Sequence, residues 1–584
     1  MNAPFFRTVL IVLSVTGCTH HSPAPILTQH QIADDRKPIA PVKERTDLKY
    51  GEVADRNTFE RLARVADVRT YLTGVGNSLG GDWGPEALNA NSFDEVADSS
   101  WFTNRNARQE VALDILRDGP PPAIHLSTVG PLAIISGKGS GDIPGFIVAD
   151  PNNQRFLLKF DSSEYCGLST STDVISSRFL YAAGYNTRET RIEHIDPARF
   201  VLDPKAKTKD RFGKKVPMDQ EAFARLIARL PGCRKDGKVR TMASRFLEGK
   251  PAGPFSYQGR RADDPNDRLP HQHRRELRGL VVLASWINNT DFQDYNTLDM
   301  FKEAGDGNGH LVHYLLDFGG SFGHGTLHPK QNYQGHIHFI DFEEAGLNLL
   351  TFGLRDPVWA QDFPIRYRSI GNFRADNFDP SEWRPSNPHP AQQQMTERDG
   401  FWGAKLVASF SDEQIRTAVR AAELPEDGAE EEMVRILKSR RDTIAKYWFS
   451  KVGALDRFVI EGDVPTVRFV DWNQAGLWRP TQAVSYRWHL RGRKIYRSGT
   501  TLKPRIELFA TKEAFETWQK QIRKSADRYL RLNITPMIED PVSLPYEKVA
   551  TTARAAGHST EASIFLHDDG RFYWVGTDRK RSSN

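Results

Sequence analysis

Three cysteines in 584 residues are too few to build a fold from disulfides, and no two of them stand at the spacing of a zinc site. Beyond the N-terminal segment, no stretch approaches the roughly 18 consecutive apolar residues of a membrane-spanning helix. The charge also lacks a dominant sign, because 79 Lys and Arg are interleaved with 74 Asp and Glu for a net charge of +5. This balance leaves no electrostatic footprint for nucleic acid, so we expect no nucleic-acid partner.

The N-terminus has the features of an export signal. Arg7 precedes a short apolar run at 8–15, and small residues lead to Cys18. This segment resembles a bacterial lipoprotein signal (residues 1–18), which implies that Cys18 carries the lipid anchor, palmitate included; the alternative is an ordinary signal peptide with a chance cysteine. Thr19 in place of Asp favours, by analogy with enteric bacteria, the periplasmic face of the outer membrane. Residues 19–48 are rich in Pro and polar residues, which predicts a disordered tether.

The other two cysteines have no fixed assignment. In an oxidising periplasm Cys166 and Cys233 can form one disulfide. Two free buried thiols explain the sequence equally well, because nothing in it fixes their separation.

The stretch from Trp286 to Gly323 combines polar residues at a suggestive spacing. Asp291 stands five residues before Asn296, and Asp317 ends an apolar run directly before Phe318. Residues 276–289 carry apolar side chains at helical spacing, while 296–301 and 310–318 have strand character around a Gly/Asp/Asn-rich turn. We therefore expect Asp291 in a loop directly after a buried helix, and Asp317 at the end of a hairpin. Taken singly, each Asp is more typical of a solvated turn or a helix cap than of a catalytic site.

Upstream, a glycine-rich segment joins predicted strands at 131–137, 145–150 and 155–161. Glycines allow a phosphate to approach the backbone closely, and Lys138 and Ser140 would add donors there. Lys159 lies near the end of the third strand among apolar residues. An ordinary hairpin and an edge-strand lysine are the competing interpretations. A helix is predicted after it, capped at Ser171 or Thr172 and ending at Gly184.

At this point the motifs support a named comparison. Residues 130–452 resemble the atypical branch of the protein-kinase-like superfamily, near the bacterial persistence-toxin kinases and the lipid-kinase-like families. More closely, DEVADSSWFTNRN, FLLKFD, SSRFLYAAGYN, RRELRGLVVLASWINNTDFQDYNTLDMF and HYLLDFGGSFG look like a family of bacterial envelope proteins with a kinase-like core. The resemblance implies an α+β fold: a bilobal protein-kinase-like core with a β-rich small lobe and a mainly α large lobe, followed by a C-terminal β-rich accessory domain.

The resemblance also implies roles for individual residues. Lys159, with Lys138 and Ser140, would bind nucleotide phosphates; Asp291 would act as base or orient the acceptor; Asn296 and Asp317 would hold Mg²⁺. Asp173 would replace the family's glutamate as partner of Lys159, one methylene shorter, with Glu164 as the fallback. Asn289 and Thr290 stand where the family has His-Arg, and no Ala-Pro-Glu element follows. Regulation of the Ser/Thr kinase type is therefore not expected.

The domain boundaries follow from these motifs and from shifts in composition. We expect an N-terminal extension that packs on the core at 49–129, a small lobe at 130–255, a large lobe at 256–461 and the accessory domain at 462–584. Within the large lobe, Ser411 and Gln414 predict a capping box, and 430–452 a long amphipathic helix. His336 and His338 are predicted on one face of a strand, where we prefer surface histidines to metal ligands.

Two functions agree with these observations. The first is Mg²⁺-dependent transfer of a phosphoryl or AMP group from ATP or another nucleotide to an envelope protein or glycan, by a protein tethered through its N-terminal lipid. The second is a catalytically inactive envelope lipoprotein that uses the kinase-like fold and the β-rich domain as a binding scaffold. Scarcity of ATP outside the cytoplasm is the argument for the second.

Overall fold

The computed structural model describes residues 34–48, 85–137, 145–209, 214–228, 230, 232–325, 328–361, 363–387, 390–476, 484–539, 553–555 and 558–579. The predicted sites at Cys18, Lys138 and Ser140 lie outside these ranges, as do residues 49–84 of the predicted extension. Residues 34–48 differ from the predicted disordered tether. Ile39 forms a bridge with Gly309, and the Arg45 amide donates to the carbonyl of Ala252 at 2.9 Å. Composition did not reveal this edge pairing, because backbone groups make it.

The first sheet has eight strands in the order β5-β9-β3-β2-β1-β6-β7, with β8 beside β9. Neighbours are antiparallel except β1 and β6. Burial alternates along β1 to β3, which confirms the predicted strands there. The strands are β1 (Leu132–Gly137), β2 (Gly145–Ala149), β3 (Arg155–Lys159), β5 (Thr190–Ile195), β6 (Phe200–Lys209), β7 (Lys215–Pro217), β8 (Arg234–Lys235) and β9 (Lys238–Arg245).

A second sheet of four strands, in the order β10-β11-β12-β4, carries the predicted hairpin. Its hairpin register runs from Thr297 opposite Leu315 to Glu303 opposite Gly309, as the turn residues predicted. β4 lies parallel to β12, with Thr187 opposite Leu315. The strands are β4 (Asn186–Thr187), β10 (Lys250–Gly253), β11 (Thr297–Glu303) and β12 (Gly309–Leu315).

Helices form the largest core around α6 (Arg275–Trp286), every residue of which is buried. It packs against α9 (Glu397–Ala408) at a close approach, because a Cβ on Gly279 would lie 2.5 Å from the Trp402 ring. The predicted capping box begins α10, and α11 matches the predicted amphipathic helix. The other helices are α3 (Leu113–Asp118), α4 (Leu168–Ala183), α5 (Gln220–Ala228), α7 (Phe342–Leu350), α8 (Pro390–Gln393), α10 (Asp412–Arg420) and α11 (Ala429–Phe449). None of the helices in the described ranges is long and apolar enough to cross a bilayer.

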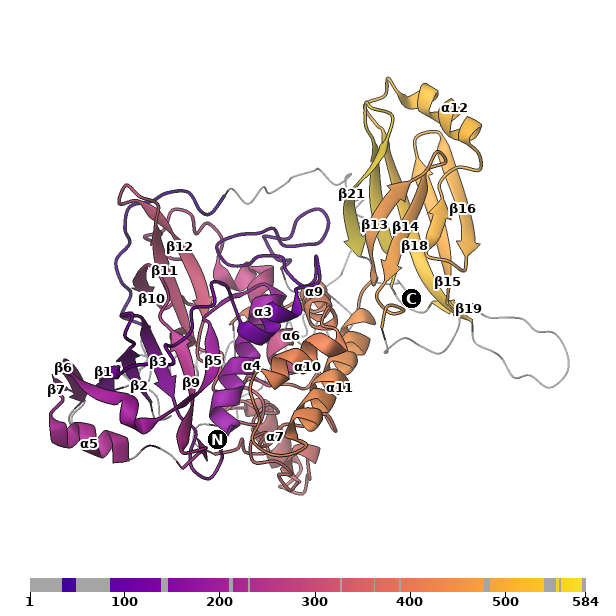
Figure 1. The fold of residues 1–584 in the computed structure, drawn as a ribbon. Helices are drawn as coiled ribbons and strands as arrows, with labels where there is room; N and C mark the ends of the chain where they lie inside the picture. The colour runs from indigo at the N-terminus through magenta and orange to yellow at the C-terminus, as the bar shows by residue number, and fades with distance from the viewer. Residues whose placement is uncertain are drawn as a thin grey trace, which may run out of the picture.

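The C-terminal region is built mainly of strands, with its own apolar core (Figure 1). One sheet has the order β13-β14-β17, and the other has β16-β15-β18-β20-β21 with β19 beside β18. The elements are β13 (Leu455–Glu461), β14 (Thr466–Asp471), β15 (Val484–Gly492), β16 (Ile495–Thr501), β17 (Arg505–Glu507), α12 (Lys512–Ile522), β18 (Tyr529–Glu539), β19 (Ala553–Ala555), β20 (Thr560–Leu566) and β21 (Phe572–Arg579).

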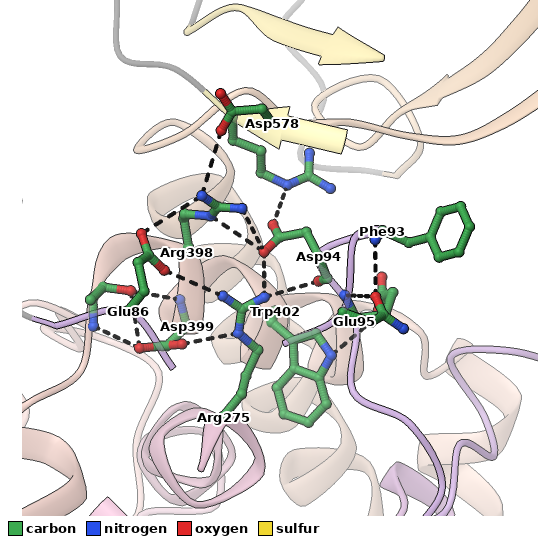
Figure 2. A network of polar contacts seen from close by, with 12 residues as sticks. Glu86, Phe93, Asp94, Glu95, Arg275, Arg398, Asp399, Trp402 and Asp578 are labelled. Atoms are coloured by element: carbon green, nitrogen blue, oxygen red, sulfur yellow. Dashed lines mark hydrogen bonds and ion pairs between the residues drawn. The ribbon is translucent and has the colours of Figure 1, made fainter. Parts of the chain in front are cut away.

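A buried ionic network joins this region to the helices (Figure 2). Asp94 accepts from Arg275 of α6, from Arg398 of α9 at 3.1 Å and from Arg579 of β21 at 2.7 Å. Arg275 also reaches Asp399 at 3.0 Å. Burial raises the pKa of Asp94, but the three arginines outweigh it and the pKa is well below its ordinary value. One carboxylate therefore connects an N-terminal segment, two helices and the last strand.

Two local predictions were wrong. α4 begins at Leu168 after Gly167 and has no side-chain cap of its own, although Ser171 or Thr172 was predicted to cap it. The Asp161 carboxylate at the end of β3 accepts from the amides of Ser169 and Thr170 at 2.9 Å each and so supplies the cap. His336 lies in a turn and His338 in an irregular segment, so neither lies on a strand.

Candidate functional site

Lys159, the last residue of β3, is buried and links two carboxylates. Its Nζ lies 2.8 Å from Asp173 Oδ2 of α4 and 2.8 Å from Asp317 Oδ1 after β12. Asp173 also accepts from the amide of Phe318 at 2.9 Å. The structure therefore brings together three predicted site residues from a strand, a helix and a loop. The fallback partner Glu164 is not needed, because Asp173 reaches the amine directly.

The position of α4 explains how Asp173 reaches Lys159 although its side chain is one methylene shorter than a glutamate. Since α4 starts earlier than predicted, Asp173 lies in its second turn rather than at its tip. Asp161, which caps the helix, lies two residues after Lys159 and makes a further contact with Arg240 of β9 at 3.6 Å. The end of β3 thus holds both the start of α4 and the lysine that pairs with it.

Asp291 and Asn296 form the second half of the site, in the Asp291 loop (residues 288–296). The Asn296 amide donates to the Asp291 carbonyl and to Asp291 Oδ2, both at 3.0 Å. The Tyr295 hydroxyl donates to Asp291 Oδ1 at 3.2 Å, and Asn289 Oδ1 accepts from the Asp291 amide at 3.0 Å. Local hydrogen bonds therefore fix the Asp291 carboxylate and leave the side-chain oxygen Oδ1 of Asn296 without a bond to any described residue.

The Asp317 loop (residues 317–323) lies directly against the Asp291 loop. The Leu316 amide donates to the Asn296 carbonyl at 2.9 Å, and the Thr290 amide donates to Gly320 at 3.0 Å. A Cβ on Gly320 would lie 2.6 Å from the Asp291 Cβ, so only glycine allows this approach. Asn296 and Asp317 consequently flank one point of the β11–β12 hairpin.

Three of the eleven non-glycine residues with positive φ in the described ranges lie in these two loops. Asn288, Asp317 and Phe322 have φ angles of 49°, 48° and 47°, in the left-handed region that non-glycine residues seldom occupy. Each such residue costs on the order of 1 kcal/mol or more and persists only where its surroundings hold it. The contacts between the two loops therefore hold these three residues in a conformation that periodicity and composition do not predict.

Lys330, which was not predicted from the sequence, connects the two loops. Its buried Nζ donates to the carbonyls of Asn288, Gly320 and Phe322, the last two at 2.6 and 3.2 Å. Burial and the neighbouring Arg440 push its pKa well below the ordinary value, against the opposing effect of Asp291. A lone lysine after a loop has no motif, so the sequence contained no signal for this position.

Arg188, immediately after β4, was missed for the same reason. Because Thr187 lies opposite Leu315, Arg188 lies beside the residue that precedes Asp317. It is half-buried, and none of its nitrogens has a hydrogen bond or ion pair with a described residue. Burial lowers its pKa, while the charges of Asp173 and Asp317 oppose the shift. A guanidinium thus stands beside the carboxylates with its donors uncommitted.

The pKa shifts separate the roles of the two halves of the site. Burial lowers the pKa of Lys159, but the charges of Asp173 and Asp317 outweigh it and the net shift is upward, so the amine stays protonated. For Asp291, burial and then the charge of Asp317 raise the pKa, against hydrogen bonds from Asn296 and Tyr295. A carboxylate with a raised pKa is a better proton acceptor than an ordinary aspartate.

The donor set fits a hard divalent cation. Asp317 supplies a carboxylate that is 39% exposed, and Asn296 an amide oxygen, which are ligand types that Mg²⁺ prefers. Within the described ranges, no group of three or more His, Cys, Asp or Glu is placed to hold a metal. Two protein ligands suit a cation that is completed by substrate phosphates and water.

A cavity of about 80 Å³ lies beside the Asp291 loop. It is bounded by Asn288 of that loop and by side chains from the segment after the Asp317 loop. Burial lowers the pKa of one of them, His336, to about 4, so its imidazole is neutral. The other lining side chains include Asn332, Trp359, Asn372, Arg374 and Trp383.

Cys166 and Cys233 form a disulfide with their Cα atoms 5.5 Å apart. The bond ties the loop before α4 to the segment before β8. The structure thus decides between the two alternatives that the sequence left open. It also braces the end of the helix that carries Asp173.

No protein-family model matches the sequence, and no curated protein matches it significantly. Among solved structures, the chain is similar to the Golgi casein kinase with Mn and ADP bound, at 10% identity, 61% of this chain, 78% of that chain and a TM-score of 0.27. It is also similar to the Helicobacter pylori proinflammatory kinase CtkA, at 11% identity, 53% of this chain, 93% of that chain and a TM-score of 0.27. TM-scores of this size do not establish a shared fold, and the site rests on its own geometry.

Proposed function

We propose that residues 130–461 form a bilobal, protein-kinase-like core that transfers a phosphoryl or AMP group from ATP or another nucleotide. The first sheet and α4 correspond to the small lobe, and α6 to α11 to the large lobe. The C-terminal strands serve as an accessory domain.

The observation that carries this proposal is the pair of 2.8 Å contacts from Lys159 to Asp173 and Asp317. A buried lysine held between a helix carboxylate and a loop carboxylate is the arrangement that protein kinases use to place nucleotide phosphates beside a metal. The Asp291–Asn296 pair next to that loop supplies the remaining groups.

Each residue then has a chemical task. Lys159 binds the phosphates, and Arg188 adds a second cation that favours charge developing on them. Asn296 and Asp317 hold Mg²⁺, which neutralises phosphate charge when bound. Asp291 orients the acceptor hydroxyl and takes its proton as the oxygen bonds to phosphorus and the bond to the leaving phosphate breaks.

We place this activity in the bacterial envelope. The lipoprotein-like signal at Cys18 predicts a lipid-anchored protein on the periplasmic face of the outer membrane, and the Cys166–Cys233 disulfide agrees with an oxidising compartment. The acceptor class that suits this address is a hydroxyl of an envelope protein or glycan.

The test is a thermal shift with ATP, with and without Mg²⁺, followed by transfer from γ- and α-labelled ATP to envelope fractions. γ-label in the product identifies a kinase, and α-label an AMP transferase. Lys159→Ala and Asp317→Asn should reduce transfer about 10²-fold or more. The matched control is Lys205→Ala, because Lys205 is exposed on β6 away from the site.

Failure has a clear form. If nucleotide does not shift the melting temperature of the wild-type protein, or if Asp317→Asn transfers label at the wild-type rate, the proposed transferase activity is wrong. The scaffold alternative then predicts that deleting 462–584 removes the cellular phenotype while Asp291→Ala leaves it intact.

A further inference from the structure

The most exposed apolar side chains of the described chain gather at the end of α7. Leu349, Leu350, Phe352 and Leu354 are 77%, 78%, 90% and 86% exposed. Isolated apolar side chains on a surface need no explanation, but a contiguous group of this kind marks an interaction site. We name residues 347–354 the apolar hook; its sequence, LNLLTFGL, contains no charged residue.

Backbone hydrogen bonds fix the conformation of the apolar hook. The Gly353 amide donates to Asn348 at 2.9 Å, and the Leu354 amide donates to Thr351 at 2.9 Å, which closes the helix in a hydrogen-bonded turn. Phe352 and Gly353 both have positive φ, at 51° and 71°, as this turn requires. The exposed side chains are therefore held in place at its tip.

Charged residues border the apolar hook on both sides without entering it. Glu344 and Arg355 stand on either side of it and form an ion pair at 2.6 Å. This pair holds the two ends of the segment together and leaves no unpaired charge on Glu344. The apolar tip thus ends at a charged base, which is the order of groups found at a membrane interface.

The pattern of exposure indicates what covers the tip. Leu349 and Leu350 are consecutive on a helix and so point about 100° apart, and Phe352 and Leu354 extend the apolar surface past the helix end. A flat protein surface covers one side of such a tip. A lipid phase, in contrast, would surround the tip on all sides. The high exposure of four neighbouring side chains matches such an environment.

We propose that the apolar hook inserts into the surface of a lipid bilayer. A lipid at Cys18, followed by a Pro-rich stretch, keeps the chain at a membrane but does not fix its orientation. Insertion of the hook supplies a second contact that does. α7 lies at the lower edge of the helical region in Figure 1, at the opposite end of the molecule from α12, so the C-terminal strands point away from the bilayer.

This orientation has a consequence for the site. Trp359 and Phe363 follow the apolar hook by five and nine residues and line the cavity beside Asn288. Insertion therefore holds that cavity close to the membrane surface. The inference does not depend on nucleotide transfer, and it stands or fails by itself.

The experiment uses the full chain with phosphatidylcholine vesicles that contain a phospholipid with a photoactivatable acyl chain, and mass spectrometry to map the labelled residues. We expect label in 347–354 in addition to any at the N-terminus. Leu350→Asp and Phe352→Asp should each reduce label in this segment about 10-fold. The matched control Leu502→Asp changes a leucine that is 70% exposed on the C-terminal region, and should leave the label unchanged.

Three outcomes would overturn the proposal. One is label confined to the N-terminal segment. Another is label in 347–354 that survives both hook substitutions. The third is a concentration-dependent dimer in the absence of lipid that Phe352→Asp abolishes, since this would assign the hook to a second copy of the chain. Thermal unfolding of each variant shows whether it has folded.

Discussion

The helices around α6 and the C-terminal strands bury very different side chains. α6 alone buries Arg275, Glu276 and Arg278, each at 0% exposure. The C-terminal core consists mainly of aliphatic and aromatic side chains, with one apolar cluster spanning both sheets. Its buried charges are few, among them Asp456, Asp471 and Arg579. Apolar burial is non-directional and tolerates repacking, whereas buried ion pairs require particular partners at particular distances. The helices are therefore fixed in position by specific contacts in addition to their large apolar core, and the strands mainly by buried apolar area.

The candidate site, like the helices around α6, depends on buried charges with specific partners. Lys159, Asp173 and Asp317 meet only because α4, β3 and the Asp317 loop hold defined positions. Asp94 uses the same principle to fix β21 against α6 and α9 (Figure 2). If the comparison is correct, removing a buried charge from the helical region should cost far more than changing a charge among the strands.

The largest effect is expected for Asp94→Ala. It leaves Arg275, Arg398 and Arg579 without their shared carboxylate, and breaking a buried ionic network in this way costs about 3–5 kcal/mol. Chemical denaturation of the purified protein measures the loss. The control is Asp578→Ala, because Asp578 contacts Arg398 at 3.6 Å and is 51% exposed. Equal losses in both variants would contradict the role given to Asp94.

Much of the local structure around the site could be predicted from the sequence. Alternation gave β1 to β3, turn residues gave the β11–β12 hairpin, and Ser411 with Gln414 gave the start of α10. Spacing singled out Asp291, Asn296 and Asp317. These signals work because each lies within one element and its adjoining turn.

What the sequence did not reveal depends on partners far apart in the chain. Asp161 caps α4 from the end of a strand. Lys330 bridges two loops by donating to backbone carbonyls, and because every residue has one, these contacts leave no signal in the sequence. Asp94 meets Arg579 across 485 positions. Such contacts appear only once the elements have packed, so periodicity and composition cannot show them.

A smaller effect is expected for Asp471 in the strands. Burial raises its pKa to about 6, against hydrogen bonds from the Asn473 amide and the Tyr486 hydroxyl. Since the folded-state pKa lies above the unfolded value of 3.8, the protonated form is favoured by folding. Stability should rise as pH falls through about 6 and level off near the unfolded value.

Asp471→Asn holds this side chain neutral and can still accept from Tyr486. We expect it to stabilise the protein by at most about 3 kcal/mol at pH 8 and to have little effect near pH 4, since each pKa unit is worth about 1.4 kcal/mol. Urea denaturation at the two pH values measures the difference. Asp463→Asn is the control, because Asp463 is 88% exposed. A wild-type protein less stable at pH 5 than at pH 8, with the same slope in Asp471→Asn, would contradict the assignment.

The smallest effect is expected for an ion pair on the surface of the strands. Arg468 and Glu461 meet at 2.6 Å, closer than Arg278 and Asp399 at 3.0 Å, but they are 59% and 44% exposed. Water screens them and their side chains lose rotamer freedom on pairing, so a double-mutant cycle should give a coupling of about 0.5 kcal/mol or less. The same cycle on Arg278 and Asp399 should give a several-fold larger coupling, because both side chains are fully buried. If the shorter pair, Arg468 and Glu461, has the larger coupling energy, then distance rather than burial decides how much an ion pair stabilises this protein. The contrast between its two regions then disappears.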